Sequence, residues 1–549
     1  MQGYFDAQSL IKACRSGRAM ATATAVLMLV AGMIPPADAA ITEPVLQWTA
    51  GGLSAGIDSA GQAARMAVDA RGNVAIVSGP SQGRDLAVTS YTENGVFRWR
   101  NTVSPASGTF VGDWVVAAPN GDFLAVGHNI NSSGNPIQTT LLRFDMNGAL
   151  LWRVEPAVGF LPTVGRLVVD ADGNAYLALS GRGSGMFVQK YDPSGTLLWS
   201  QRDLTGSGYA LASSLALSPD GGDVVVTGGI SGGASWNTIA YDAATGVRKW
   251  QVTAAEGTTA KDVVVDATRV YVTGQGATGA GTPALKYFLT VVAYERATGK
   301  RLWRTDRKPA DGNDAFGLRM TMAPDGSLAV TGQTNRGFLD WYTVALETTG
   351  TVRWEAVRDG KLNTDEIPRA VLVMPDGTTV VTGRGGPNLA GGYIPGVTAG
   401  YSSSGQLLWV AFSTLETIWA AALPNGDVCA TGGYDALVTC WSVPANVVTP
   451  PPDIVPLPTA PASLVASSTT RRRIDLVWRN TASDASSIMV ERCAGSACTA
   501  FAPVAQLAAT ATSWSDSQVK SKSTYSYRLR ATNTAGSSEY SNTASATAR

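Results

Sequence analysis

The chain of 549 residues has very little histidine and little charge, and each shortage excludes a class of function. Its single histidine, His128, excludes every metal centre that needs two or more imidazole ligands. Only 15% of the residues are charged, and 42 basic residues are balanced by 42 acidic ones. The chain therefore lacks the positive excess typical of proteins that bind nucleic acid, and we expect no nucleic-acid partner.

Apolar runs long enough to cross a membrane are also missing. The mostly apolar stretch at residues 19–34 is shorter than the roughly 20 residues of a spanning helix. It follows three basic residues within 12–18 and ends before a small-residue pattern at 37–39, which is typical of an export signal. We predict a signal peptide over 1–39, a secreted, periplasmic or cell-envelope location, and no membrane span after cleavage. An uncleaved N-terminal anchor is the alternative.

Cysteine is scarce, and its spacing is informative. Of five cysteines, one lies in the predicted signal peptide and the other four form two close pairs, Cys429 with Cys440 and Cys493 with Cys498. Each pair flanks a turn, which favours two local disulfides, in agreement with export. A zinc site is the alternative, but its four thiolates would have to bridge two segments of different character. We therefore predict two disulfides and no metal.

Glycine and tryptophan, in contrast, are abundant and regularly placed. Glycine makes up 60 of the 549 residues, about 11% against roughly 7% in average chains. Eight of the 15 tryptophans follow one another at spacings of 47 to 55 residues: Trp48, Trp99, Trp152, Trp199, Trp250, Trp303, Trp354 and Trp409. Such a constant period indicates a repeated structural unit.

Two kinds of hairpin recur in the repeat unit. One leads into the tryptophan, as in residues 191–199 (Tyr-Asp-Pro-Ser-Gly-Thr-Leu-Leu-Trp), and the other carries an Asn-Gly or Asp-Gly pair, as in residues 219–221. These pairs supply the positive φ angles that a tight reversal between strands requires. Each unit therefore holds four short strands and almost no helical periodicity.

Eight such units predict an all-β fold, an eight-bladed β-propeller over residues 40–443. The first tryptophan strand, residues 45–48, has no unit before it, and the last unit stops at Val443 without its outer strand. The two fragments complete one blade, so we expect the N-terminal strand to close the ring. Closure would remove exposed sheet edges, which suits a chain with so little charge.

The repeat resembles a known group of propellers. Residues 240–250 (Ala-Tyr-Asp-Ala-Ala-Thr-Gly-Val-Arg-Lys-Trp) and 293–303 (Ala-Tyr-Glu-Arg-Ala-Thr-Gly-Lys-Arg-Leu-Trp) resemble the tryptophan-docking repeat of quinoprotein (PQQ-type) eight-bladed propellers. The Asp-Gly-Asn and Thr-Gly strand pattern is also similar to bacterial secreted SBBP-type repeats. The resemblance implies that the eight tryptophans pack between neighbouring blades and have a structural role.

Quinone enzymes of that group bind their cofactor over the central channel with calcium, a catalytic aspartate and, in many members, adjacent cysteines. This sequence has no adjacent cysteine pair, and no residue matches the calcium or catalytic positions. We predict no cofactor. Quinone (PQQ) with calcium belongs only to an alternative in which the chain is a quinone-dependent dehydrogenase with a degenerate site.

A second domain follows a proline-rich linker. Residues 444–461 contain seven prolines in eighteen positions, which favours an extended spacer. Residues 462–549 have the size of a β-sandwich, and their end, 525–542, resembles the end of a fibronectin type III domain. By that resemblance Trp478 is the core tryptophan and Tyr525 is the tyrosine-corner residue.

Three short motifs suggest chemistry, but their surroundings do not fit. Residues 229–233 match a serine-hydrolase elbow, and residues 274–279 match a dinucleotide loop, yet neither is followed by the helix that the chemistry needs. Residues 170–174 resemble a calcium loop but fall in the recurring hairpin column. We therefore predict no catalytic residue and no metal site in these motifs.

Polar residues follow the glycine that ends the second strand in five units. They are His128, Arg182, Gln275, Gln333 and Arg384, and we expect them in loops at the rim of the central funnel as candidate ligand-binding residues. A catalytic base at His128 is the alternative. The leading hypothesis is an exported, non-catalytic, monomeric binding or scaffold protein that presents the propeller surface to a protein or glycan. A second hypothesis is an extracellular polysaccharide-active enzyme using carboxylates such as Asp85, Asp340 and Asp435.

Overall fold

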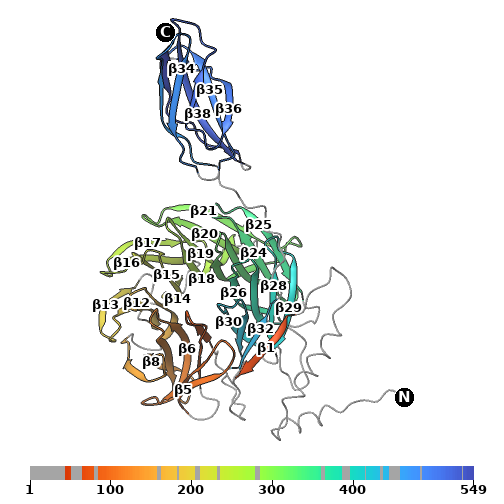
Figure 1. Cartoon of the computed structure of the whole chain (residues 1–549). Coiled ribbons are helices and arrows are strands. Elements are labelled where there is room, and N and C mark those ends of the chain that lie inside the picture. The colour runs from red at the N-terminus through yellow and green to blue at the C-terminus, as the bar shows by residue number, and fades with distance from the viewer. Residues whose placement is uncertain are drawn as a thin grey trace. The chain divides into compact units, whose positions relative to one another are not determined.

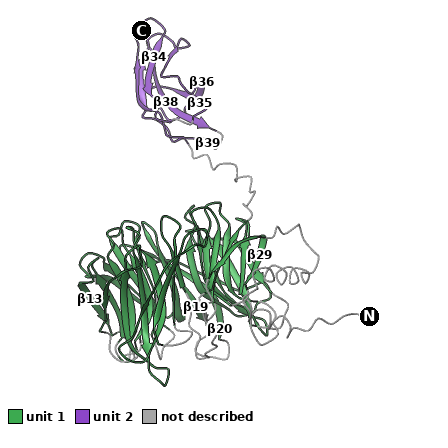
Figure 2. Cartoon of the chain, turned by 60° about the horizontal axis from the view of Figure 1, so that its bottom comes forward, with its two compact units in different colours: residues 1–446 green, residues 447–549 purple. Residues whose placement is uncertain are grey.

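The computed structural model of the protein contains two compact units, Met1–Asn446 and Val447–Arg549 (Figure 2). The structure describes residues 44–50, 65–79, 84–157, 162–181, 183, 185–204, 210–230, 235–278, 285–359, 365–385, 396–413, 416–432, 437–443, 458–482, 485–496, 498–533 and 536–549. The predicted signal peptide and most of the predicted linker lie outside these residues. None of the described residues forms a helix long and apolar enough to span a membrane.

The described part of unit 1 contains eight antiparallel sheets of four strands each. Each sheet has a first strand nearest the centre: β2 (Arg65–Val68), β6 (Thr109–Ala117), β10 (Thr163–Val169), β14 (Ala210–Leu217), β18 (Gly257–Val265), β22 (Ala315–Met322), β26 (Ile367–Val373) and β30 (Thr417–Ala422). The second strands are β3 (Val74–Ser78), β7 (Phe123–Ile130), β11 (Ala175–Gly181), β15 (Asp223–Ile230), β19 (Arg269–Thr278), β23 (Leu328–Asn335), β27 (Thr379–Arg384) and β31 (Val428–Gly432). The third strands are β4 (Leu86–Tyr91), β8 (Pro136–Phe144), β12 (Gly185–Tyr191), β16 (Ser235–Asp242), β20 (Lys286–Glu295), β24 (Leu339–Leu346), β28 (Gly396–Tyr401) and β32 (Leu437–Ser442). The outer strands are β5 (Phe97–Val103), β9 (Leu150–Val154), β13 (Leu197–Asp203), β17 (Arg248–Ala254), β21 (Arg301–Arg307), β25 (Val352–Arg358), β29 (Leu407–Ser413) and β1 (Val45–Ala50).

The turn between a first and a second strand shows why the sequence reverses there. In residues 170–174, the Asp170 carboxylate accepts hydrogen bonds from the backbone nitrogens of Asp172 and Asn174. Gly173 has a φ of 82°, a conformation that glycine adopts without steric cost. The Asp170 carboxylate therefore stabilises the hairpin, in agreement with the turn interpretation of this motif.

The sheets of unit 1 are arranged around a common centre (Figure 1). Each first strand contacts the first strand of the next sheet along the chain, from β2 through to β30, and β30 in turn contacts β2. The residues between the sheets are mostly apolar and buried, and they form a series of separate core clusters. This all-β arrangement of four-stranded sheets is consistent with the predicted β-propeller.

The first and last strands of unit 1 share a sheet. Strand β1 pairs antiparallel with β32, and Trp48 lies opposite Cys440. Cys440 also lies opposite Cys429 on β31, and the two cysteines form a disulfide. The predicted pairing of these cysteines is therefore confirmed, and the covalent bond lies next to the strand pair that joins the two ends of the unit.

Seven of the eight repeated tryptophans dock on the next sheet in the same way. The indole of Trp199 donates a hydrogen bond to the carbonyl oxygen of Ala243 at 3.2 Å, and a Cβ added to Gly246 would lie 2.7 Å from the ring. The same glycine contact recurs for Trp48, Trp99, Trp152, Trp250, Trp303 and Trp354, on Gly95, Gly148, Gly195, Gly299, Gly350 and Gly405. Packing between neighbouring sheets is thus confirmed for these tryptophans.

Trp409 differs from the other seven. Its ring lies against Gly400 of its own sheet, and it packs with Val428 and Trp441 of the next one. The next sheet takes its outer strand, β1, from the other end of the chain, so it has no third-to-outer hairpin and no turn glycine for Trp409 to cover. Trp409 therefore packs between neighbouring sheets, as expected, but it does not cover a turn glycine of the next sheet as the other seven tryptophans do.

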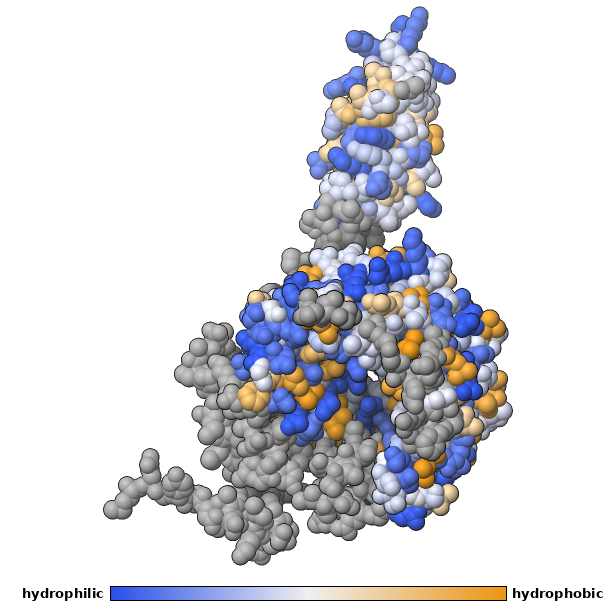
Figure 3. Space-filling model, turned by 180° about the vertical axis from the view of Figure 1, so that it is seen from behind, coloured by the Kyte–Doolittle hydropathy of each residue, from blue (hydrophilic) through white to orange (hydrophobic). Residues whose placement is uncertain are grey.

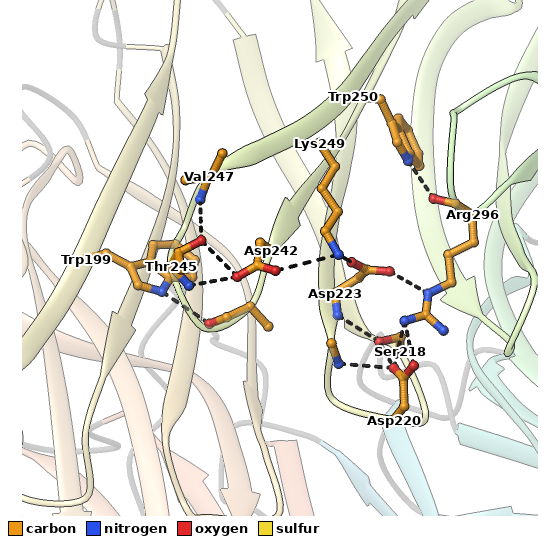
Figure 4. Close-up of polar contacts among 12 residues, drawn as sticks. Trp199, Ser218, Asp220, Asp223, Asp242, Thr245, Val247, Lys249, Trp250 and Arg296 are labelled. Atoms are coloured by element: carbon orange, nitrogen blue, oxygen red, sulfur yellow. Dashed lines mark hydrogen bonds and ion pairs between the residues drawn. The ribbon is translucent and has the colours of Figure 1, made fainter.

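Charged groups also hold neighbouring sheets together. Figure 4 shows this for the boundary between the sheet that ends in β17 and the next sheet along the chain. Arg296, on the hairpin that receives Trp250, pairs with Asp220 at 2.7 Å and also with Asp223. Lys249 pairs with the same Asp223. Hydrogen bonds from Ser218 and from Arg296 hold the pKa of Asp220 below its ordinary value. The network ties one turn to the next and has a structural role.

Unit 2 is a sandwich of two sheets. One contains β33 (Ala462–Ser467), β34 (Ile474–Arg479) and β37 (Ser513–Asp516), and the other contains β36 (Ala502–Ala508), β35 (Ser487–Ala494), β38 (Thr524–Asn533), β39 (Gly536–Ser537) and β40 (Ala544–Thr547). Trp478 is buried in the core between them, as predicted. Tyr525 is also buried, and its hydroxyl accepts a hydrogen bond from the backbone nitrogen of Lys520. The second predicted disulfide, Cys493–Cys498, is confirmed.

Candidate functional site

The first strands of unit 1 share an irregularity that shapes the centre. In seven of the eight described first strands the pairing with the second strand shifts by one residue at the same place: after Gly112, Val164, Ala212, Ala260, Gly317, Pro368 and Thr417. Such a β-bulge inserts an unpaired residue into the first strand and changes the direction in which the neighbouring side chains point. The residue that resumes pairing is Trp114, Arg166, Ser214, Asp262, Arg319, Ala370 or Trp419. Arg65 stands at the matching distance before the turn in β2.

Side chains at these positions meet although they come from different sheets. The guanidinium of Arg65 lies 3.6 Å from the ring centroid of Trp114 and 5.7 Å from that of Trp419. The two indoles contact each other edge to face at 5.1 Å, and Arg166 lies 5.3 Å from Trp114. We call Arg65, Trp114, Arg166, Ser214, Asp262, Arg319 and Trp419 the axial cluster. Its cation–π contacts place positive charge against the indole faces.

Asp262 is the main acceptor of the axial cluster. It accepts hydrogen bonds from Arg166 at 2.9 Å, from the Ser214 hydroxyl at 2.6 Å and from the backbone nitrogen of Met320 at 3.0 Å. Its side chain is only 3% exposed. A single carboxylate therefore joins the first strands of four successive sheets, β10, β14, β18 and β22.

Other cations at the centre have no carboxylate partner among the described residues. Nε and Nη1 of Arg65 and Nε of Arg319 are buried without a hydrogen-bond partner. Burial, together with repulsion from Arg319, lowers the pKa of Arg65 to about 9. Burial and the charge of Arg319 likewise lower the pKa of Lys261, which occupies the bulge of β18. The centre of unit 1 thus carries unneutralised positive charge.

His128 forms an ion pair in the same region. Its Nδ1 lies 2.7 Å from the carboxylate of Asp113, the bulge residue of β6. Burial alone would lower the pKa of His128, but the hydrogen bond and charge of Asp113 outweigh it, so this pKa lies above its ordinary value. Thr139, opposite His128 on β8, is fully buried. His128 is thus held by an ion pair between the first and second strands of its own sheet.

The funnel-rim candidates were expected in loops, and the structure corrects this location. His128, Gln275, Gln333 and Arg384 lie within second strands, in β7, β19, β23 and β27, because cross-strand pairing continues past the glycine. Gln275 accepts a hydrogen bond from Thr258, and the carbonyl oxygen of Arg384 accepts one from Trp341. Each lies in a separate sheet, so these contacts do not join the candidates into one site. Arg182 lies outside the described residues.

The sequence reasoning missed the axial cluster. A signal was present, because each member stands four positions before the first residue of the hairpin turn, as Arg65 does before Asp69 and Arg166 before Asp170. Aligned on the turns, these positions read Arg, Trp, Arg, Ser, Asp, Arg, Ala and Trp in chain order. The sequence reasoning used instead the position after the glycine of the second strand, and the described residues at that position make no contacts with one another that would join them into one site.

A calcium–quinone centre does not fit the residues of the described chain. No group of three or more His, Cys, Asp or Glu side chains there could hold a metal ion. The central carboxylates, Asp113 and Asp262, already pair with His128 and Arg166. The unpartnered groups beside them are cations, which repel a divalent cation.

One face of unit 1 is hollowed at its centre, and both hydrophilic and hydrophobic side chains surround the hollow (Figure 3).

Residues 184–390 and 288–430 match the family model described as Outer membrane protein assembly factor BamB. The match lies within unit 1, from β12 to β31, and agrees with the expected PQQ-type repeat. It covers less than half of the chain, so it shows similarity to that family.

Three solved structures are similar to parts of the chain. Hydrazine synthase from Kuenenia stuttgartiensis is 14% identical, with 72% of this chain and 99% of that chain covered and a TM-score of 0.42. A puromycin hydrolase is 15% identical, with 78% and 65% covered and a TM-score of 0.39. An Fn3-like protein from Clostridium thermocellum is 25% identical, with 16% and 92% covered and a TM-score of 0.15. TM-scores below 0.5 carry no argument, and no curated protein matches the chain.

Proposed function

We propose that unit 1 is a closed eight-bladed β-propeller and unit 2 a fibronectin type III domain, in an exported binding or scaffold protein. The cyclic contacts of the first strands and the pairing of β1 with β32 support closure. The buried Trp478 and the contact between Tyr525 and Lys520 support the fibronectin assignment. Two disulfides suit an extracellular or envelope location.

The observation that carries the binding role is that the carboxylates at the centre are already engaged. Asp262 is saturated by Arg166, Ser214 and Met320, and Asp113 pairs with His128. Polar groups whose hydrogen bonds are satisfied in this way hold the first strands in fixed positions, as a rigid scaffold requires. The rigid ring then presents its surface to a protein or glycan ligand.

A binding experiment with rim variants tests this role. The purified full chain is screened against a glycan array and against proteins of the cell envelope, and the tightest ligand is titrated. Replacing Gln275, Gln333 and Arg384 together by alanine should weaken binding at least tenfold, whereas Arg153→Ala, at an exposed ion pair, should not. Unchanged binding by the triple variant would overturn the rim assignment, and absence of any saturable ligand would overturn the binding role.

One observation favours the polysaccharide-active alternative. Burial and the nearby charge of Asp359 raise the pKa of Asp340 to about 6, within the range of a general acid. Arg336 lies 3.8 Å from Asp340, 3.7 Å from Asp359 and 2.6 Å from Asp311. Release of reducing ends from a polysaccharide by the wild-type chain, lost in Asp340→Asn, would support this function; no release above a heat-inactivated control would remove it.

A further inference from the structure

The ionisable side chains of the first strands and their partners do not balance in charge. The cations are Arg65, Arg166, Lys261, Arg319 and Arg369, and the carboxylates are Asp113, Asp262 and Glu416. Among the described residues these five cations exceed the three carboxylates by two charges, and protonation of His128, the partner of Asp113, raises the excess to three. Three ion pairs, Arg166 with Asp262, Arg369 with Glu416 and His128 with Asp113, account for all the carboxylates.

The excess resides on groups that have no carboxylate partner. Arg319 donates one hydrogen bond, from Nη1 to the carbonyl oxygen of Leu318, and leaves its buried Nε unsatisfied. Arg65 contacts the two indoles but leaves Nε and Nη1 unsatisfied. Arg65, Arg166 and Arg319 are close enough to repel one another electrostatically, and Arg319 also repels Lys261.

Buried unpaired cations destabilise a fold unless a counter-charge compensates them. A bound anion would satisfy the unpaired guanidinium groups, because its oxygens accept their hydrogen bonds. Its negative charge would also offset the excess positive charge. Guanidinium groups match carboxylate and phosphate oxygens in geometry and form charge-assisted hydrogen bonds with them.

We propose that the centre of unit 1 binds a small dianion bearing phosphate or carboxylate groups, held by Arg65 and Arg319 of the axial cluster and by Lys261 in the bulge of β18. Trp114 and Trp419 border the Arg65 side of this site, and Asp262 keeps Arg166 out of it. The inference goes beyond the proposed function, because the site is internal to the propeller and does not depend on a protein or glycan at its surface.

Calorimetric unfolding of the full chain at constant ionic strength tests the site, with inorganic phosphate and succinate as separate probes and chloride as the balance. A bound anion should raise the Tm of unit 1 saturably, by roughly 2 °C or more. A rise with phosphate alone assigns phosphate chemistry, and a rise with succinate alone assigns carboxylate chemistry. No saturable rise with either probe would overturn the proposal.

Variants separate a binding role from a structural one. In Arg319→Met and Arg65→Met the anion-dependent rise should disappear, while the Tm without anion should stay equal or increase because an unpaired cation is gone. Arg307→Met, which removes a paired cation from β21, should keep the rise. A rise retained in both axial variants would contradict the site. If either variant fails to fold, Arg319→Lys should bind at least fivefold more weakly, and equal affinity would contradict it.

Discussion

Asp262 accepts a hydrogen bond from Arg166 at 2.9 Å, although the two residues lie on first strands two sheets apart. The pair therefore spans part of the centre of unit 1, and the Ser214 hydroxyl of the intervening strand joins it. Such a contact between sheets that are not neighbours is possible because the sheets are arranged around a common centre (Figure 1). The Arg166–Asp262 hydrogen bond joins two sheets that are not neighbours, whereas each docked tryptophan joins its own sheet only to the next one.

We expect Asp262→Asn to destabilise unit 1 by about 3 kcal/mol, because Arg166 loses its counter-charge beside other cations. Ser214→Ala removes a single hydroxyl from the same carboxylate and should cost about 1 kcal/mol. Urea unfolding of both variants measures the difference. Equal losses would show that the ion pair adds nothing beyond the hydrogen bond.

His128, the only histidine, gives a direct test of its pairing with Asp113. Its imidazole signals should titrate by NMR with a midpoint above 6.5, and Asp113→Asn should lower that midpoint. Because the folded pKa is raised, the pair stabilises the fold fully below pH 6.5 and less as pH rises through the folded pKa. A midpoint unaffected by Asp113→Asn would contradict the pairing.

Asp340 should make stability depend on pH in the acidic range. Its folded pKa of about 6 lies above the usual 3.8, so the folded state binds more protons between these values. Stability of the wild type should fall from pH 4 to 6, relative to Asp340→Asn, by about 1 to 3 kcal/mol. Denaturant unfolding at both pH values measures this, and parallel pH profiles would refute the raised pKa.

The tryptophan docking predicts a contrast between two glycines with positive φ. Gly246 faces the ring of Trp199 at 2.7 Å, whereas Gly221 has nothing within 4 Å of an added Cβ. Gly221→Ala should cost about 1 kcal/mol from backbone strain alone, and Gly246→Ala should cost 1 to 3 kcal/mol more because the indole must move. Thermal unfolding of the two variants compares them. Similar Tm values would mean that the Trp199 ring moves at little cost in free energy.

Removal of the Cys429–Cys440 disulfide should destabilise unit 1 by about 2 to 3 kcal/mol, since the bond closes a loop with a sequence separation of 11. Calorimetry of the Cys429→Ser, Cys440→Ser double variant measures this. The matching double replacement of Cys493 and Cys498 should shift only the transition of unit 2. A shift of the unit 1 transition by the second pair would show that the units unfold together.

The strands and turns were predictable because they depend on local chemistry. Glycines such as Gly173 mark reversals through their positive φ, and the spacing of tryptophans such as Trp199 marks the outer strands. The pairing of Cys429 with Cys440 was also predictable, because both flank one turn. The departure of Trp409 was not, since it depends on which strand occupies the outer position of the neighbouring sheet.

The sequence by itself determined the repeat, the all-β fold, the pairing of the N-terminal strand with the last sheet and the local disulfides, because each depends on short-range patterning or on fragments that complement each other. Only the tertiary structure decided what lies at the centre. Arg65, Trp114, Asp262 and Arg319 are far apart in the chain, and their common position before the turn does not show that they contact one another. They meet because the sheets are arranged around one centre and the bulges of the first strands turn these side chains toward one another, and the resulting excess of unpaired positive charge exists only after folding.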